Sequence, residues 1–425
     1  MDIAVIAVFV TLIVLLCFGF HIGVAMSVSV LAGLYVGDLP YLLFTQRLYN
    51  TFESFPLLAV PFFVLAGDIM QHGSMSASLI NFSRTLVGHM RGALAQISVL
   101  TCMFYGALCG SAPATTAAVG GMMIPAMEKE GYPKSFASAV NACSGCLGLL
   151  IPPSTTLIIY GSTAGVSISD LFLAVVVPGL LCGCALMLVS YFISVRNGYG
   201  QPSPKASASQ RVKALWNAKW SLMVPVIVLG GIYGGITTPT EAGAIAVVYS
   251  LVVEIFVLRT MTLKKFREIC RSSLTTIGSI FFVVAAANGL GTILVYYNTQ
   301  EIIAEFMQKI MINPQVMMIA LILLLLFLGT FMETVACVLI LTPMLLPSYM
   351  AMGIDPIHFG IVLTFGLTLG LITPPVGVNL FVACGINGIS FSLLSRAVLP
   401  FLGASILVLF IVGLIPALSL QQFSF

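Results

Sequence analysis

Charged residues are scarce in this sequence, where Asp, Glu, Lys and Arg together account for 7% of the 425 residues. Soluble globular domains contain about 25% charged residues. The low charge content, with 59% hydrophobic residues and a mean hydropathy of +1.11, therefore excludes an ordinary soluble protein. A net charge of only +3 provides no basic surface for DNA or RNA, and we expect no nucleic acid among the partners. The sequence predicts an all-α, polytopic membrane protein embedded in a lipid bilayer.

Two motifs of enzyme chemistry are also absent. The sequence has no Gly-x-x-x-x-Gly-Lys-Ser/Thr phosphate loop and no His-Glu-x-x-His motif. The four His are scattered along the chain, and the ten Cys lie mostly in apolar segments, where they behave as small hydrophobic residues. We therefore expect no ATP hydrolysis, no enzyme activity, no cofactor and no transition-metal site.

Long apolar segments follow one another along the chain, and most can cross about 30 Å of hydrocarbon. The first has no Lys or Arg before it, unlike a cleaved signal peptide, and we expect it to be retained as a span. The predicted spans are residues 3–20, 22–37, 52–70, 136–165, 171–195, 221–237, 242–258, 274–297, 358–386 and 397–418.

Two further apolar segments, residues 92–127 and 316–350, are about 35 residues long and contain Gly, Pro, Ser and Thr near their centres. That length exceeds one span, and the central break favours two half-helices folded back on each other as a re-entrant hairpin. A kinked span followed by an amphipathic helix is the alternative.

The two halves of the chain are related by an ungapped shift of 222 residues. The best local match places Gly-Leu-Leu-Ile-Pro-Pro at 148–153 on Gly-Leu-Ile-Thr-Pro-Pro at 370–375. Each motif lies in the middle of an apolar segment, where a Pro pair breaks a helix. We expect two structural repeats, each with a re-entrant hairpin and a Pro-Pro-broken helix.

The shift and the spans predict where each repeat begins and ends. The first repeat covers residues 1–196, with spans in 1–70, a hairpin at 92–127, a broken helix at 136–165 and a final span at 171–195. Residues 197–218, rich in Gly, Pro and Ser, are the predicted cytoplasmic linker. The second repeat covers 219–425, with spans in 221–297, a hairpin at 316–350, a broken helix at 358–386 and a final span at 397–418.

Charge predicts the orientation of the repeats. If the basic segment 196–219 is cytoplasmic, 15 of the 17 Lys and Arg fall on the cytoplasmic side, and only Arg47 and Lys309 fall opposite. This assignment requires an odd number of full spans in each half. The repeats are therefore expected to be inverted relative to each other, with both termini facing outward.

Helices broken inside a membrane expose backbone groups that need a partner, because an unsatisfied amide or carbonyl is costly in hydrocarbon. Carbonyl oxygens and Ser or Thr hydroxyls there suit sodium, and helix N-termini suit an anion. The predicted sodium ligands of the first hairpin and broken helix are Gly110, Ser111, Thr115, Thr116, Pro152 and Ser154. Those of the second are Gly329, Thr330, Glu333, Thr334, Thr373, Pro374 and Gly377.

A substrate anion is expected to contact hairpin amides and hydroxyls, since no buried Arg stands out as a carboxylate clamp. The candidate substrate-binding residues are Ser111, Ala112, Thr155, Val376 and Asn379. Three roles stay open for Glu333, which could bind sodium, stabilise the hairpin tip or pair with a cation. Helix packing and interhelical hydrogen bonds are the alternative to ligand contact for the small and amide residues.

Several motifs resemble one family of membrane proteins. They are Gly-Ser-Ala-Pro-Ala-Thr-Thr-Ala-Ala-Val-Gly at 110–120, Pro-Phe-Phe-Val-Leu-Ala-Gly-Asp at 61–68, Val-Gly-His-Met-Arg-Gly at 87–92, Thr-Pro-Thr-Glu-Ala at 238–242 and the two Pro-Pro motifs. This combination resembles the large membrane subunit (DctM/SiaM type) of tripartite ATP-independent periplasmic (TRAP) transporters, along essentially the whole chain. One departure is Ala112-Pro113 after Ser111, where family members often carry a second Ser, so one hydroxyl ligand is expected to differ.

The resemblance implies an elevator-type fold in the bacterial inner membrane, where the outward-facing termini expected from the charge count would be periplasmic. It implies sodium-driven uptake of a small organic acid such as sialic acid, a C4-dicarboxylate or a related carboxylate or sulfonate. Two protein partners are implied as well, a small four-helix membrane subunit of the DctQ/SiaQ type and a periplasmic substrate-binding protein of the DctP/SiaP type. A free-standing sodium/dicarboxylate symporter, which needs no binding protein, is the alternative.

Overall fold

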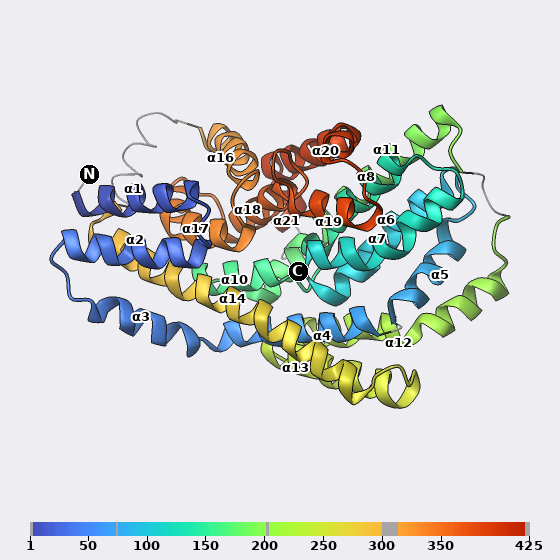
Figure 1. Ribbon diagram of the computed structural model, residues 1–425, viewed down its shortest axis with the longest axis horizontal. Coiled ribbons are helices and arrows are strands. Elements are labelled where there is room, and N and C mark those ends of the chain that lie inside the picture. The colour runs from blue at the N-terminus through green and yellow to red at the C-terminus, as the bar shows by residue number, and fades with distance from the viewer. Residues whose placement is uncertain (1–2, 74, 201–203, 300–312, 421–425) are drawn as a thin grey trace.

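The computed structural model describes residues 3–73, 75–200, 204–299 and 313–420, and every regular element in these ranges is helical (Figure 1). Within the same ranges, eight helical segments are long and apolar enough to cross a membrane. The expected all-α, polytopic membrane architecture is thereby confirmed.

The described residues of the first half of the chain form eleven α-helices and one short 3₁₀ helix, η1. They are α1 (Ile3–Cys17), α2 (Ile22–Val36), α3 (Leu42–Phe52), η1 (Phe55–Leu58), α4 (Ala59–His72), α5 (Met75–Val87), α6 (Ala93–Cys109), α7 (Ala112–Lys129), α8 (Lys134–Gly145), α9 (Leu147–Leu150), α10 (Thr155–Ala164) and α11 (Ile168–Asn197). The sequence predicted no element at the position of α5.

The second half contains a π-helical turn, η2, directly after its second helix. Its elements are α12 (Ala208–Tyr233), α13 (Pro239–Val252), η2 (Val253–Val257), α14 (Leu263–Tyr296), α16 (Pro314–Gly329), α17 (Thr334–Ala351), α18 (Pro356–Gly370), α19 (Val378–Asn387), α20 (Phe391–Leu414) and α21 (Ala417–Leu420). Since α12 begins at Ala208, the later part of the segment expected to be linker is helical.

The helix bounds recur at the spacing found in the sequence. Adding 222 to the bounds of α7 gives those of α17, and the same addition brings α8 onto α18 and α10 onto α19. The packing is reciprocal: α2 packs on α14 while α13 packs on α4, and α19 packs on α7 while α10 packs on α17. Equivalent helices of the two halves thus exchange equivalent neighbours, as two related repeats would.

The two repeats differ where one helix is interrupted. In the first repeat α3, η1 and α4 occupy the positions that the continuous, 34-residue α14 occupies in the second. Pro56 explains the break, because proline lacks an amide donor and disfavours a helical conformation for the residue before it. The helix α14 begins 11 residues before the predicted span at 274, and the Thr262 side chain caps it by accepting from the Lys265 amide at 3.2 Å.

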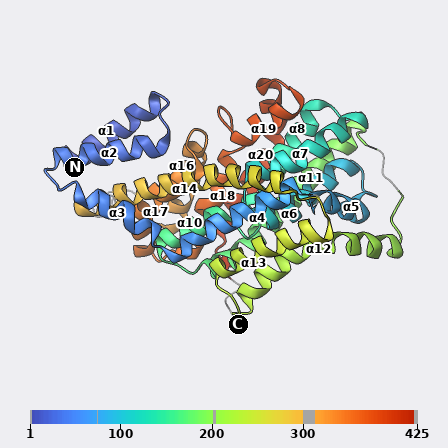
Figure 2. The ribbon, with the colours of Figure 1, turned by 60° about the horizontal axis from the view of Figure 1, so that its bottom comes forward.

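Two groups of helices can be distinguished. We call α6 to α11 with α16 to α21 the transport block, and α1 to α5 with α12 to α14 the scaffold. The scaffold helices α3, α4, α12 and α13 lie along the lower edge of Figure 1, and Figure 2 shows α1 and α2 paired at one end. The most apolar window of the broken span Lys134–Ala164 is 94% buried, against 28% for α12, so the broken span lies at the centre of the molecule.

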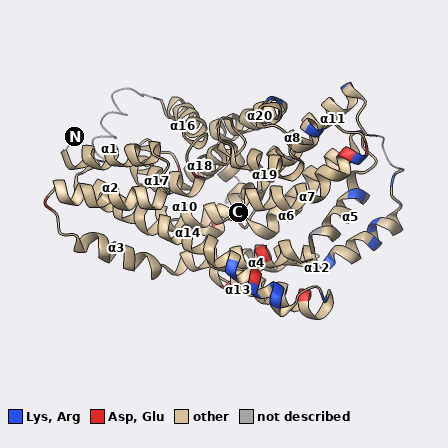
Figure 3. Cartoon of the chain, in the orientation of Figure 1, with Lys and Arg blue, Asp and Glu red and all other residues tan. Residues whose placement is uncertain are grey.

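Basic side chains lie mostly in one half of the molecule, away from α1 and α2 (Figure 3). Figure 3 shows Lys and Arg around α5, the end of α11 and the start of α12, and at the turn from α13 to α14, with few around α1 and α2. These are segments that the charge count assigned to one side of the membrane. Lys309, one of the two residues assigned to the opposite side, lies outside the described residues.

Candidate ion and substrate site

The first hairpin reverses at Gly110 and Ser111, between α6 and α7. Gly110 has a φ of +58°, in the left-handed region that glycine adopts without strain, and Ser111 is extended. Pro113 lies in the first turn of α7, where the missing amide donor costs nothing. The predicted helix break at the centre of residues 92–127 is therefore present, and α6 packs against α7.

The tip of this hairpin is fastened to the first broken helix. The backbone amide and the hydroxyl of Thr155 both donate to the Gly110 carbonyl oxygen, at 3.5 and 3.0 Å. A Cβ atom at Gly110 would lie only 2.6 Å from the Pro153 carbonyl oxygen. Two carbonyl groups from separate segments thus lie beside the buried start of α10, where a cation would find hard oxygen ligands.

Gly148 allows the broken helix to reach the same tip from its other side. A Cβ atom at this position would lie 2.5 Å from the Ser111 carbonyl oxygen and 2.3 Å from the Thr115 hydroxyl oxygen. Such distances leave no room for a side chain, so the backbone of α9 touches the hairpin directly. The first Gly of the repeated Gly-Leu-x-x-Pro-Pro motif is therefore a contact residue.

The second hairpin makes the equivalent contact. Here α16 ends at Gly329, and a Cβ atom at Gly370 would lie 2.3 Å from the Gly329 carbonyl oxygen. Gly370 and Gly148 are the matching residues of the repeated motif. Beyond the Pro pair, Gly377 has a φ of +57° and is the residue immediately before α19. Both tips therefore meet their broken helices backbone to backbone.

Glu333 caps a helix in this structure. Its carboxylate accepts a hydrogen bond from the Ala336 amide at 2.9 Å, so it stabilises the N-terminus of α17. Of the three roles left open by the sequence, the geometry supports stabilisation of the tip. The hydroxyl of Thr330 donates to the Phe327 carbonyl at 2.7 Å and closes the preceding turn.

The hydroxyl groups of the two sites fall into two sets. Thr115, Thr116 and Thr373 donate to carbonyls one turn earlier in the chain, at 2.7 to 3.0 Å. The Thr115 hydroxyl oxygen is also 3.1 Å from the Cys109 sulfur. Ser154 and Thr334 are buried, and neither hydroxyl has a hydrogen-bond partner within the described part of the chain. A buried hydroxyl without a partner is costly, and a sodium ion would satisfy its oxygen.

Asn379 joins the two broken helices. Its side-chain amide donates to the Ala142 carbonyl at 3.2 Å and to the Cys146 sulfur at 3.6 Å. Its amide oxygen is buried without a partner among the described residues. The Cys146 thiol donates in turn to the Thr368 carbonyl at 3.4 Å, across a separation of 222 residues. Asn379 thus provides an interhelical hydrogen bond and an unsatisfied oxygen.

The predicted site residues are brought together in two clusters. Gly110, Ser111, Thr115 and Thr155 contact one another through the first tip, together with the Pro-Pro segment at 152–153. Gly329, Thr330 and Thr334 lie at the second tip, and Thr373, Pro374 and Gly377 lie at the break between α18 and α19, which meets that tip through Gly370. Ala112 is buried in the first turn of α7, whereas Val376 is exposed beside the second Pro pair.

Two acidic residues near the ends of predicted spans, Asp68 and Glu241, have structural partners. Glu241 forms a capping box with Thr238 at the start of α13, and it lies away from both tips. The Asp68 carboxylate accepts a hydrogen bond from the Ser273 hydroxyl at 2.5 Å, which joins α4 to α14 within the scaffold. Within the described residues, no group of three or more His, Cys, Asp or Glu is arranged to hold a metal ion.

Comparison with known proteins identifies the family. The family profile described as "Tripartite ATP-independent periplasmic transporter, DctM component" matches residues 9–418. The C4-dicarboxylate TRAP transporter large permease protein DctM of Pseudomonas aeruginosa is 41% identical over 88% of this chain and 87% of that protein. The sialic acid TRAP transporter large permease protein SiaM of Vibrio cholerae is 39% identical, with 88% of each chain covered.

A third relative is longer than this chain. The isethionate TRAP transporter permease protein DctMQ of Oleidesulfovibrio alaskensis is 40% identical over 94% of this chain, which spans 63% of that protein. Two solved transporters share the fold at 15% identity: YdaH of Alcanivorax borkumensis (TM-score 0.66, 87% of each chain) and MtrF of Neisseria gonorrhoeae (TM-score 0.61, 87% of this chain and 83% of that one). With the profile matching nearly all of its length, the chain belongs to the DctM family of TRAP transporter large permease subunits.

Proposed function

We propose that this chain translocates a small organic acid across the bacterial inner membrane, driven by sodium. The observation that carries the proposal is the pair of tip contacts, in which each hairpin meets a broken helix backbone to backbone. Both contacts leave buried carbonyl and hydroxyl oxygens next to helix N-termini. Such an arrangement suits a cation and an anion at adjacent positions.

Sodium would be held by oxygens of the two tip clusters. Ser154, Thr334 and the carbonyls near Gly110 supply hard, neutral oxygens, which suit a monovalent cation. A bound ion would fix the tips against the broken helices and so preorganise the helix N-termini for the substrate anion. Binding of the ion and of the acid would then be reciprocally coupled.

An elevator movement is the second part of the proposal. The broken helices pack on the hairpins of both repeats, so the transport block forms one body. Its contact with the scaffold includes a hydrogen bond between the Ser54 and Ser162 hydroxyls, whose oxygens are 3.2 Å apart. A bond of this kind is readily exchanged for water, which suits a surface that slides.

The substrate class follows from the names of the relatives, whose cargoes are C4-dicarboxylate, sialic acid and isethionate. All three are acids, and we assign this chain a carboxylate or sulfonate of similar size. A small four-helix membrane subunit is expected on the exposed apolar faces of α1, α2 and α12, which present Ile13, Tyr35 and Trp216. A periplasmic binding protein is expected to deliver the acid.

Uptake into proteoliposomes tests the proposal. The chain is reconstituted with its small subunit, and accumulation of labelled succinate, sialic acid and isethionate is measured with and without an inward sodium gradient and the binding protein. Accumulation that needs both sodium and the binding protein is the expected result. Uptake without the binding protein would identify a free-standing symporter, and uptake indifferent to sodium would refute the ion sites.

A further inference from the structure

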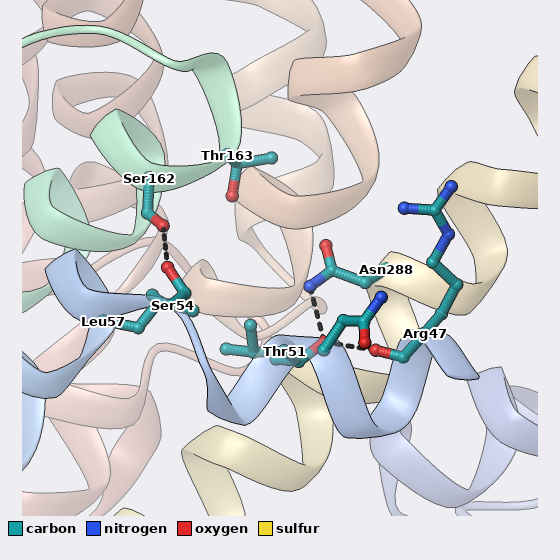
Figure 4. Close-up of a pocket in the computed structure, with 9 residues that line it drawn as sticks. Arg47, Thr51, Ser54, Leu57, Ser162, Thr163 and Asn288 are labelled. Carbon is teal, nitrogen blue, oxygen red and sulfur yellow. Dashed lines mark hydrogen bonds between the residues drawn. The ribbon is translucent and has the colours of Figure 1, made fainter. Parts of the chain in front are cut away.

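A polar pocket lies between the scaffold and the transport block, away from the two tip clusters. It has a volume of about 220 Å³. Arg47, Asn50 and Thr51 of α3 line it with Asn288 of α14, and Ser162 and Thr163 enter from α10 (Figure 4). That volume holds roughly seven water-sized groups, which is the size of a small organic acid.

The hydrogen bonds of the lining leave the pocket rich in donors. The Asn288 amide donates to the Thr51 hydroxyl at 2.8 Å, and that hydroxyl donates to the Arg47 backbone carbonyl at 2.8 Å (Figure 4). The Arg47 guanidinium forms no ion pair with a described carboxylate. No Asp or Glu is among the described residues that line the pocket. Among the described residues that line the pocket, Arg47 therefore carries the only charge.

The pocket continues toward the surface. Ser54 and Ser162 line it and also line a larger cavity of about 500 Å³, which extends to residues 165–169 and to Thr238 at the start of α13. The charge count assigns these turns to the outer side of the membrane. Within the described part of the chain, Arg47 is the one basic residue assigned to that side.

We propose that this pocket is an outer binding site for the acid group of the cargo, held by the Arg47 guanidinium and the Asn50 and Asn288 amides. The inference rests on the proposed function, because it gives the carboxylate or sulfonate a first site before the hairpin tips. Guanidinium binds either group with two parallel hydrogen bonds, and the amides supply further donors. Ser162 and Thr163 belong to the transport block, so the acid bridges scaffold and block.

Variants of Arg47 test the site. Arg47→Gln removes the charge, and Arg47→Lys keeps the charge but cannot form the two parallel hydrogen bonds of a guanidinium. Lys213→Gln, at an exposed position near the start of α12, is the control for the change in net charge. We expect Arg47→Gln to lower sodium-driven uptake at least tenfold, Arg47→Lys to lower it less, and the control to stay within twofold of wild type. Unchanged uptake by Arg47→Gln would overturn the proposal.

Docking of the binding protein is measured separately on the same purified complexes. We expect Arg47→Gln to bind it within twofold of wild type. A loss of uptake matched by an equal loss of docking would show that Arg47 contacts the binding protein, and would overturn the anion site. Should Arg47→Gln fail to assemble, Asn50→Asp replaces it, because a carboxylate at this exposed position would repel the acid and lower uptake.

Direct binding keeps this test independent of transport. Succinate, sialic acid and isethionate at millimolar concentrations are expected to raise the melting temperature of the wild-type complex more than that of Arg47→Gln, which keeps only the proposed site at the hairpin tips. Equal stabilisation of both proteins would overturn the pocket as the outer site. The wild-type complex could also bind an acid without accumulating it in the presence of sodium. That result would refute the proposed function but would still support the pocket as a binding site.

Discussion

The contact between Gly370 and Gly329 gives the sharpest prediction about the ion sites. In Gly370→Ala, the new methyl group would lie 2.3 Å from the Gly329 carbonyl oxygen and 2.5 Å from its Cα. Carbon and oxygen atoms in contact are ordinarily at least about 3.3 Å apart. The hairpin tip must therefore retreat from the broken helix by roughly 1 Å.

The size of the effect follows from the cost of overpacking. Inserting a methyl group into a close-packed contact costs about 1–3 kcal/mol. If that cost falls on the state in which the tip is closed around the ion, the concentration of sodium that gives half-maximal uptake rises by about 5- to 150-fold. The same substitution at Gly148, which faces the Ser111 carbonyl at 2.5 Å, is expected to act on the first site.

Two glycines of the same block supply matched controls. A Cβ atom at Gly121 in α7 or Gly385 in α19 would meet no atom within 4 Å. Alanine there favours the helix by up to about 1 kcal/mol, so sodium dependence should stay unchanged. Initial uptake rates in proteoliposomes are measured against sodium concentration for all four variants. A Gly370→Ala protein whose half-saturating sodium matches that of Gly385→Ala would refute the backbone contact as part of an ion site.

Three further predictions concern movement, ligand contact and stability. The Ser54 and Ser162 hydroxyls are 3.2 Å apart, so cysteines at both positions should form a disulfide between the scaffold and the transport block on oxidation. In the double variant Ser54→Cys with Ser162→Cys, oxidation should stop uptake and a reductant should restore it. Full uptake after verified cross-linking would exclude sliding at this contact. Asn379→Leu should lower uptake at least tenfold, since it removes a buried amide oxygen that has no hydrogen-bond partner among the described residues and could contact the ligand. Uptake at the wild-type rate would show that Asn379 serves only helix packing. Tyr160→Phe should reduce the free energy of unfolding by about 1 kcal/mol and lower the melting temperature, because the Pro356 carbonyl loses its 2.5 Å hydrogen bond. Altered sodium dependence of uptake would contradict this purely structural role.

Much of the site was predictable because its signals are local. Gly and Pro at 110–113, and the Pro pairs after Gly148 and Gly370, determine helix ends by their own backbone properties, so the breaks appear where the sequence places them. The 222-residue shift then predicted equivalent helices in the second half. These features need no knowledge of tertiary contacts.

Other features depend on helix boundaries or on distant contacts that the sequence does not indicate. Glu333 looks like a membrane-embedded carboxylate in the sequence, but its position one residue before α17 makes it a helix cap. The Arg47 pocket requires α3 to lie beside α10, more than a hundred residues later. The only sequence signal for Arg47 was its place as one of two basic residues outside the cytoplasmic set.

The packing of helices from one repeat on the other affects the order in which the chain can fold during its synthesis. The second half of each broken helix packs on the hairpin of the other repeat, α10 on α17 and α19 on α7. During synthesis from the N-terminus, α7 therefore emerges long before its neighbour at Val378–Asn387 exists. The first hairpin is completed only when nine-tenths of the chain has been made, and neither repeat is a finished unit without the other.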